Sequence, residues 1–299
     1  MNVSPAPAPV VRLSAEWQDW LAGNIVRGCV DDDLLRMMVD GGFDAQFARV
    51  AISVVRSMTE RVQQQAPAML AESMAAAYKA DPIRLPSTAR SRAHDRDIDI
   101  GFTLSDPNVA LLIGVLSDDE CKRLIELSAG KLRRSEVVDR ATGRVEVSGV
   151  RTSEGTHFEI GENEIVSRLE RRLAALTGIP LENGEPLQIL HYRPGGEYLP
   201  HHDYFDPTDS GSAAHLQVGG QRIATVVIYL DDVPAGGDTA FPTLGLSVRP
   251  RRGSAVYFEY FNRSGDVDPR CLHAGAPVQA GEKWIATKWL RQSAYRQPS

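Results

Sequence analysis

Residues 187–192 read LQILHY, and from this point the chain changes from a helical pattern to an alternating one. Further β-rich runs follow at residues 223–230, 254–260 and 284–290, and turns rich in Gly, Pro and Asp separate them. Several short strands with turn signals at such intervals are typical of a sandwich or a jelly roll. The sequence therefore predicts a β-rich core in the second half of the chain.

A candidate metal site lies inside this β-rich stretch. Residues 199–204 read LPHHDY, so His201 precedes Asp203 by two positions. Residues i and i+2 of a strand project from the same face, so an imidazole nitrogen and a carboxylate oxygen can reach one ion. A second imidazole is available at His273. Two imidazoles and one carboxylate on one face of a metal are the facial triad of non-haem Fe(II) oxygenases. A zinc hydrolase could use the same ligands, but no general-base glutamate stands at a recognisable offset.

Lys283 follows His273 by ten positions and begins another predicted strand. By itself, a lysine in a Gly-Glu-Lys turn would be interpreted as a surface residue, but this offset favours an inward position. Strand parity would then place Thr287 and Trp289 on the inner face as well. Because an unpaired buried ammonium costs on the order of several kcal/mol, an organic dicarboxylate is its expected partner. The phenol of Tyr192 and the hydroxyl of Thr287 could donate further hydrogen bonds to it.

Composition and charge exclude several classes of protein. The 299 residues carry a net charge of −6, which gives no support to a nucleic-acid or anionic-membrane partner. Cys29, Cys121 and Cys271 are widely spaced without a CxxC motif, so a disulfide framework is not expected and a reducing compartment fits best. Residues 1–10 lack the features of a signal peptide, and the longest apolar run, 109–116, is too short to span a bilayer. We expect a cytoplasmic protein.

The first hundred residues are predicted to form a loose tail, a helical segment and a linker, ahead of a catalytic domain at 101–299. Trp17 and Trp20 are expected to cap the core of the helical segment. The linker is predicted at residues 81–99, which are polar and mixed in charge. An amphipathic helix is predicted from apolar residues at three- and four-residue spacing. These residues are Phe47, Val50, Ala51, Val54, Val55 and Met58.

Between the linker and the β-rich core, supporting elements are expected. Residues 109–115 predict a short strand, and a capping box at 117–120 predicts the start of a helix. Residues 164–176 predict a further helix.

Seven runs of sequence carry a family resemblance. They are QILHY at 188–192, YLPHHD at 198–203, RIAT at 222–225, YLDDV at 229–233, GGDTAFP at 236–242, HAGAPV at 273–278 and GEKW at 281–284. Together they resemble the prolyl 4-hydroxylase family of Fe(II)/2-oxoglutarate-dependent dioxygenases. The residues of the runs between 188 and 204, and the lysine at 283, resemble the collagen- and plant-type branch of this family. The resemblance spans about residues 108–294 and does not clearly cover the N-terminal helical segment.

The resemblance implies an α+β fold, in which a double-stranded β-helix (jelly roll) forms the catalytic core beside supporting helices. It implies Fe(II) and the co-substrate 2-oxoglutarate, with ascorbate as a candidate further cofactor. The residues implied to bind iron are His201, Asp203 and His273. Those implied to hold 2-oxoglutarate are Tyr192, Lys283 and Thr287, with Lys283 on the distal carboxylate. Those implied to line the side of the peptide substrate are Tyr198, Arg222 and Trp289.

The implied reaction is hydroxylation of a proline residue in a peptide or protein, coupled to oxidative decarboxylation of 2-oxoglutarate to succinate and CO2. The chemistry would be carried by His201, Asp203, His273 and Lys283. Halogenation is rejected, because related halogenases lack the carboxylate that Asp203 supplies. Arg151 is a candidate member of a loop that closes over a peptide.

Two alternatives stay open. The same chemistry could act on another residue or on a small molecule, because substrate choice depends on loops such as 139–160 and 205–221. The chain could instead be a non-catalytic metal-binding module whose N-terminal helices bind an unknown partner.

Overall fold

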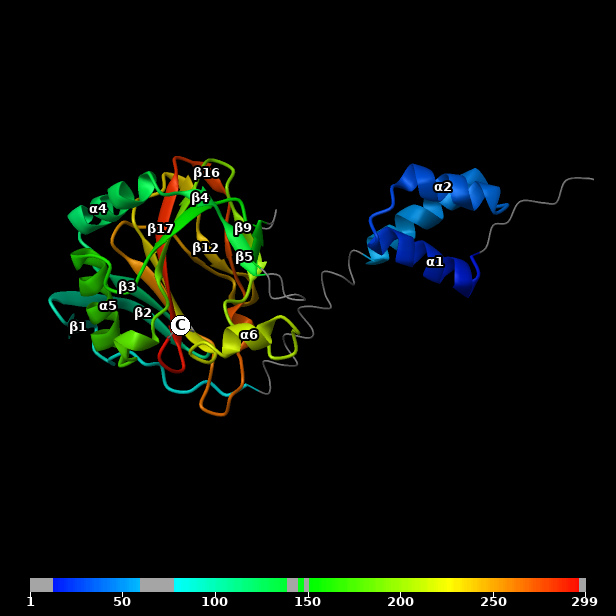
Figure 1. The fold of residues 1–299 in the computed structure, drawn as a ribbon. Coiled ribbons are helices and arrows are strands. Elements are labelled where there is room, and N and C mark those ends of the chain that lie inside the picture. The colour runs from blue at the N-terminus through cyan, green and yellow to red at the C-terminus, as the bar shows by residue number, and fades with distance from the viewer. Residues whose placement is uncertain (1–12, 60–77, 139–144, 148–150, 296–299) are drawn as a thin grey trace, which may run out of the picture. The chain divides into compact units, whose positions relative to one another are not determined.

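The structure is a computed structural model, and it describes residues 13–59, 78–138, 145–147 and 151–295 (Figure 1). It divides into two compact units, residues 1–73 and residues 74–299. Among the described residues, none of the helices combines the length and the apolar character that crossing a membrane requires.

The N-terminal unit contains helices α1 (Ala15–Val26) and α2 (Asp31–Asp40), and a third helix over residues 45–59. Ser14 caps α1 by accepting a hydrogen bond from the backbone N–H of Trp17. Trp17 and Trp20 meet edge to face and pack against the core of this unit, as predicted. The buried core residues are Leu21, Ile25, Leu34, Met38, Phe43, Ala48, Ala51 and Ile52.

The apolar stripe predicted over residues 47–58 is only partly correct. The side chains of Val50, Val54 and Met58 are 57%, 47% and 61% exposed. The helix instead turns Ala48 and Ile52 into the core. These two apolar residues have the same four-residue spacing as Val50 and Val54, so spacing alone did not show which row faces α1 and α2.

The second unit is built on antiparallel sheets. The larger sheet has the strand order β1-β2-β3-β14-β10-β17-β8-β7-β4, and the smaller one has the order β13-β12-β15-β9. The strands of the larger sheet are β1 (Arg90–Ala93), β2 (Arg96–Ser105), β3 (Asn108–Ile113), β4 (Arg133–Arg134), β7 (Glu154–Phe158), β8 (Leu187–Tyr192), β10 (Arg222–Tyr229), β14 (Ala255–Glu259) and β17 (Lys283–Arg291). Those of the smaller sheet are β9 (Tyr198–His201), β12 (Thr239–Phe241), β13 (Leu246–Val248) and β15 (His273–Gly275). Separate pairs join β5 (Glu136–Val138) to β6 (Val145–Val147) and β11 (Ala235–Gly236) to β16 (Val278–Ala280).

The prediction of a linker at residues 81–99 is wrong for its second half, because residues 90–93 and 96–99 belong to strands of the larger sheet. β1 and β2 form a hairpin, and β2 continues the larger sheet by pairing with β3. The expected boundary between residues 100 and 101 falls inside β2. The polar composition of this stretch suggested a linker because cross-strand ion pairs such as Arg90 with Asp99 give the hairpin a polar surface. Ile98 is fully buried beneath that surface.

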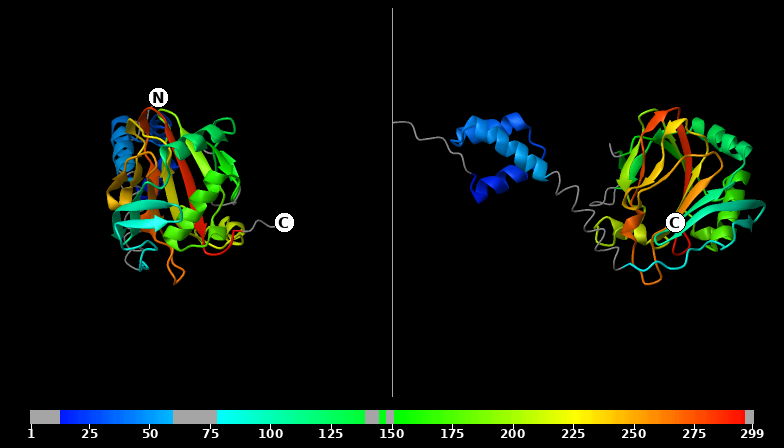
Figure 2. Two further views of the ribbon diagram at one scale, coloured as in Figure 1. Left: turned by 90° about the vertical axis from the view of Figure 1, so that its left-hand side faces the viewer. Right: turned by 180° about the vertical axis from the view of Figure 1, so that it is seen from behind.

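Helices cover one face of the larger sheet, and the smaller sheet covers the other (Figures 1 and 2). Helix α4 (Asp118–Ala129) begins with the predicted capping box, and α5 (Glu164–Thr177) packs beside it. Their apolar residues form one core with the outward residues of β10 and β17. The inward residues of the same strands form a second core with β12 and β13. The predicted α+β class is confirmed, and two facing sheets are the arrangement expected of a double-stranded β-helix.

Short helices lie in the connections. They are η1 (Leu181–Asn183), α6 (Ser212–Leu216), η2 (Pro242–Leu244) and η3 (Pro269–Cys271).

Candidate active site

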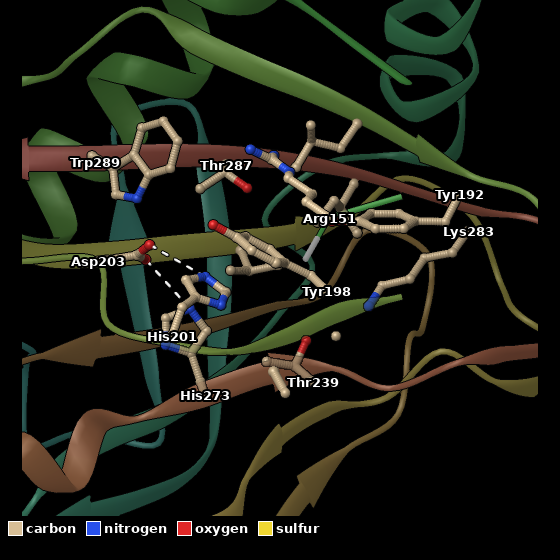
Figure 3. A pocket seen from close by; sticks show the side chains of 15 residues that line it. Arg151, Tyr192, Tyr198, His201, Asp203, Thr239, His273, Lys283, Thr287 and Trp289 are labelled. Carbon is tan, nitrogen blue, oxygen red and sulfur yellow. Dashed lines mark ion pairs between the residues drawn. The ribbon is translucent and has the colours of Figure 1, made fainter. Parts of the chain in front are cut away.

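Three side chains that can bind a metal converge between the two sheets (Figure 3). They are His201 at the end of β9, Asp203 two residues later, and His273 at the start of β15. One ligand atom from each lies within 4.8 Å of the other two. Nε2 of His201 is 3.7 Å from Oδ1 of Asp203, and Nε2 of His273 is 3.5 Å from Oδ2. The structure therefore brings together the three residues that the sequence predicted as metal ligands.

Sheet register and backbone carbonyls orient both imidazoles. β9 pairs with β15 so that His201 lies directly opposite His273. Nδ1 of His201 lies 2.9 Å from the carbonyl oxygen of Leu199, and Nδ1 of His273 lies 3.0 Å from that of Cys271. A carbonyl can only accept, so Nδ1 carries the proton in each ring. Each Nε2 is left with its lone pair toward the centre of the cluster.

His201 and Asp203 have the charge states of metal ligands at neutral pH. Burial, together with the neighbouring His273, lowers the pKa of His201 to about 3. Burial opposes ionisation of Asp203, but the nearby His273 and His201 outweigh it and lower the pKa of Asp203 to about 2. A neutral imidazole and an ionised carboxylate bind a cation without first losing protons.

A pocket runs from the metal cluster toward Lys283, whose side chain enters from the opposite end (Figure 3). Lys283 is only 2% exposed. In the part of the chain that the structure describes, no carboxylate accepts a hydrogen bond from its ammonium. Burial lowers the pKa of Lys283 to about 8, against the opposing charge of Asp238. The ammonium of Lys283 can therefore bind an anionic group at this end of the pocket.

The alternation along β17 is the one predicted from strand parity. Lys283, Thr287 and Trp289 line the pocket. On the opposite face of the strand, Lys288 is also buried, and its Nζ lies 2.6 Å from the carboxylate of Glu170 in α5. One strand therefore holds two buried lysines, one paired inside the protein and one facing the pocket.

Aromatic and cationic side chains close the pocket near the metal cluster. The rings of Tyr198 and His201 are stacked with centroids 3.6 Å apart. The guanidinium of Arg151 lies 4.9 Å from the Tyr198 ring and donates to Gln188 at 2.9 Å. Arg151 is buried and belongs to the pocket wall. From the sequence, Arg151 is expected only in a loop that closes over a peptide. Its place in the pocket wall depends on an isolated bridge to Tyr198, which the sequence does not reveal.

Arg222, predicted on the peptide side, is not among the residues that line this pocket. Its guanidinium binds both oxygens of Glu185, at 2.6 and 2.9 Å, and stacks on Trp289 with its central carbon 3.9 Å from the ring. It also donates to the backbone oxygen of Asp203 at 3.2 Å. Arg222 therefore supports both Asp203 and Trp289, through contacts that strand parity could not reveal.

Known proteins with similar sequences identify the family. A family model described as the 2OG-Fe(II) oxygenase superfamily matches residues 187–291. The Arabidopsis thaliana protein named probable prolyl 4-hydroxylase 6 is 42% identical over 208 residues, which cover 63% of this chain and 70% of that protein. The chain belongs to the prolyl 4-hydroxylase family.

Two further known proteins are similar to parts of this chain. Probable prolyl 4-hydroxylase 7 of Arabidopsis thaliana is 41% identical over 207 residues, and this chain spans 64% of its length. A solved structure of the viral collagen prolyl hydroxylase from Paramecium bursaria Chlorella virus-1, described as a 2OG complex, is 30% identical. It covers 61% of this chain and 95% of its own, with a TM-score of 0.49.

The side chains fit the cofactors of a prolyl 4-hydroxylase, which are Fe(II) and 2-oxoglutarate. Two imidazoles and one carboxylate, with no thiolate ligand, suit non-haem Fe(II) and leave other coordination positions open. His201, Asp203 and His273 would hold the iron. Among the described residues Lys283 has no ion-pair partner, so it can take the distal carboxylate of 2-oxoglutarate.

Two hydroxyls at the site were missed by sequence analysis. Thr239 lines the pocket and accepts a hydrogen bond from Tyr229 at 2.8 Å. Thr225 lies opposite Trp289 in the ladder between β10 and β17, and it contacts Asp203. Its inward position could have been found by extending the parity argument from β17 to β10, once the register of the two strands was known.

The buried carboxylate of Glu185 should contribute strongly to stability, because Arg291 also binds it, at 2.6 Å. We expect Glu185→Ala to lower the free energy of unfolding by about 3–5 kcal/mol, since it leaves the buried Arg291 and the partly buried Arg222 without their counter-ion. Urea denaturation measures this loss. The exposed Glu182 provides a matched control, for which Glu182→Ala should cost less than about 0.5 kcal/mol. Equal losses in the two variants would contradict the assignment.

Proposed function

We propose that this protein is a peptidyl prolyl 4-hydroxylase that couples hydroxylation of a proline residue to the conversion of 2-oxoglutarate and O2 into succinate and CO2. The observation that carries the proposal is one pocket, with a two-histidine, one-carboxylate cluster at one end and, at the other, the buried ammonium of Lys283, which has no ion-pair partner among the described residues. A keto diacid has a chelating group for the first end and a carboxylate for the second. The family relationship supports proline as the residue that is hydroxylated.

Bound iron and 2-oxoglutarate supply the oxidation, and the protein supplies binding, orientation and a dry site. Lys283 binds the distal carboxylate, and the hydroxyls of Tyr192 and Thr287 donate further hydrogen bonds to the co-substrate. The pocket walls include the apolar side chains of Val227 and Ile285, which exclude water from the reacting atoms.

The peptide is proposed to lie against Tyr198, Trp289 and the Arg222 that stacks on Trp289. The indole Nε1 of Trp289 is buried and has no hydrogen-bond partner within the described residues. A buried donor of this kind costs free energy unless it is satisfied, so it suits a carbonyl oxygen of the substrate. All residues assigned to the reaction lie between 151 and 289, and we therefore place catalysis in the second unit.

The proposal can be tested in two stages. Anaerobic addition of Fe(II) and 2-oxoglutarate to folded protein should give a weak visible charge-transfer band, and its absence would favour a non-catalytic metal-binding module. Succinate release is then measured with proline-containing peptides and with matched peptides in which proline is replaced by alanine. Stimulation by both sets alike, or by neither, would favour the same chemistry on another residue or on a small molecule.

The binding of 2-oxoglutarate should weaken as the pH rises above about 8. The unliganded protein loses the Lys283 proton near this pH, whereas pairing with the carboxylate requires the charged ammonium. Affinity should then fall by up to about tenfold per pH unit, because one proton must be taken up on binding. Calorimetric titration between pH 7 and pH 10 measures this slope. Lys283→Arg, which stays charged over the whole range, should give a flatter profile, and identical profiles would contradict the assignment.

Ascorbate dependence and a cytoplasmic location complete the proposal. Ascorbate is suggested by the family, and the location by the three widely separated cysteines, which fit a reducing compartment. Turnover in repeated cycles with and without ascorbate tests the first, and fractionation of cells that express the protein tests the second.

A further inference from the structure

A chain of buried hydroxyls reaches the carboxylate of Asp203. Thr225, on the inner face of β10, donates from Oγ1 to Oδ2 of Asp203 over 2.7 Å. The hydroxyl oxygens of Thr225 and Tyr260 are 2.9 Å apart. Thr225 and Tyr260 are both fully buried, and Asp203 is 7% exposed. Solvent therefore cannot replace either hydroxyl without a rearrangement of the core.

The direction of these hydrogen bonds follows from the chemistry of the three groups. An ionised carboxylate can only accept, so the Thr225 proton must point to Asp203. The oxygen of Thr225 then offers only lone pairs to its other neighbour, and the Tyr260 hydroxyl must donate to it. The bonds run from Tyr260 to Thr225 to Asp203, and in a dry environment each donor polarises and strengthens the next.

This chain treats the two oxygens of Asp203 differently. Both oxygens face the cluster, Oδ2 at 3.5 Å from Nε2 of His273 and Oδ1 at 3.7 Å from Nε2 of His201. Only Oδ2 is engaged by Thr225, and Oδ1 accepts no hydrogen bond from the residues that the structure describes. A carboxylate with one oxygen engaged offers a metal one strong ligand atom instead of two. With a single carboxylate oxygen on the metal, His201, Asp203 and His273 would leave more of its coordination positions to the co-substrate.

We propose that Thr225 is a positioning residue that, supported by Tyr260, restricts Asp203 to a single metal-binding oxygen. The inference rests on the proposed function, since it concerns the iron site of the family. Removing the Thr225 hydroxyl frees Oδ2, lets the carboxylate rotate and changes the number of ligand atoms it presents. Metal affinity and coordination geometry should therefore both respond, whereas a purely structural role would change only the stability of the fold.

The test compares four variants with the wild-type chain. Thr225→Val removes the hydroxyl and keeps the branched shape, Thr225→Ser keeps the hydroxyl, and Tyr260→Phe removes the second donor. Tyr257→Phe is the matched control, because Tyr257 is fully buried on the other face of β14 and its hydroxyl donates to Glu259 at 2.7 Å, away from the site. Each protein is titrated anaerobically with Co(II), whose visible spectrum depends on coordination number and whose binding requires no turnover.

We expect Thr225→Val to weaken Co(II) binding by roughly 10- to 100-fold, the usual effect of losing a partner of a metal ligand, and to change the visible spectrum. Tyr260→Phe should give a smaller loss in the same direction. Thr225→Ser and Tyr257→Phe should match the wild type in both affinity and spectrum.

The outcomes separate this inference from the proposed function. Wild-type affinity and spectrum in Thr225→Val would overturn the inference while leaving the iron site intact. Wild-type protein that binds no Co(II) would overturn the proposed function as well. If near-ultraviolet circular dichroism shows that Thr225→Val is misfolded, Tyr260→Phe decides, and unchanged metal binding in that variant overturns the inference.

Discussion

Asp203→Ala is expected to abolish succinate release and to prevent stable binding of Fe(II). Asp203 supplies the negative charge of the cluster, and its oxygens lie 3.5–3.7 Å from the two imidazole Nε2 atoms. Loss of a mere partner of a metal ligand typically costs 10- to 100-fold, so loss of the ligand itself should lower turnover by more than about 100-fold. Succinate release and iron content after gel filtration measure the two effects.

Two controls make the Asp203 result specific. Asp203→Asn keeps the shape and the hydrogen bond from Thr225 but removes the charge, so it should also be inactive while remaining folded. Asp206→Ala removes an aspartate three residues away, whose carboxylate accepts from Thr208 instead of facing the cluster. That variant should retain activity. Near-normal turnover in either Asp203 variant would contradict the assignment of this residue as a ligand.

Lys283→Met should raise the 2-oxoglutarate concentration required for turnover by a large factor while iron still binds. Truncating one partner of a buried, hydrogen-bonded charge pair costs roughly 2–5 kcal/mol, and each 1.4 kcal/mol or so is tenfold. The KM for 2-oxoglutarate should therefore rise by about 30-fold or more. Without co-substrate the variant should resist urea better than the wild type, because methionine removes a buried charge that has no ion-pair partner in the described part of the chain.

Lys288→Met is the matched control on the same strand. Lys288 is buried to the same extent as Lys283, but it faces α5 and pairs with Glu170. Its loss should destabilise the fold by about 3–5 kcal/mol, since a buried carboxylate is left unpaired, and should leave the KM for 2-oxoglutarate unchanged. The two lysines thus have opposite expected effects on stability. The same direction of change in both would argue that Lys283 has a structural partner.

The alternation of side chains along a strand predicted more of the site than any other feature of the sequence. Alternation along residues 283–290 separated Lys283, Thr287 and Trp289 from Lys288, and the structure places these two sets on opposite faces of β17. The two-residue spacing of His201 and Asp203 likewise predicted that they share a centre. The first prediction concerns neighbours within one strand, where the backbone decides the direction of each side chain. The second named the right pair for a different reason, because β9 ends at His201 and Asp203 lies in a bend beyond it.

The helical region was less predictable for a related reason. Apolar residues in the helix over residues 45–59 occupy more than one face. Their spacing therefore allowed either the row of Val50 and Val54 or the row of Ala48 and Ile52 to face the core, and the prediction included the exposed row. Likewise, the hairpin of β1 and β2 looked like a linker because its cross-strand ion pairs exist only after the strands meet.

The sequence by itself determined which residue types can bind a metal and a diacid, and that Lys283, Thr287 and Trp289 share one side of their strand. Tertiary structure alone decided that β9 pairs with β15 in the register that sets His201 opposite His273. It also decided that Glu185 joins Arg222 to Arg291, and that Thr225 reaches Asp203. The physical reason is that side-chain direction is a local property of the backbone, whereas strand pairing and register depend on hydrogen bonds and burial between segments far apart in the chain.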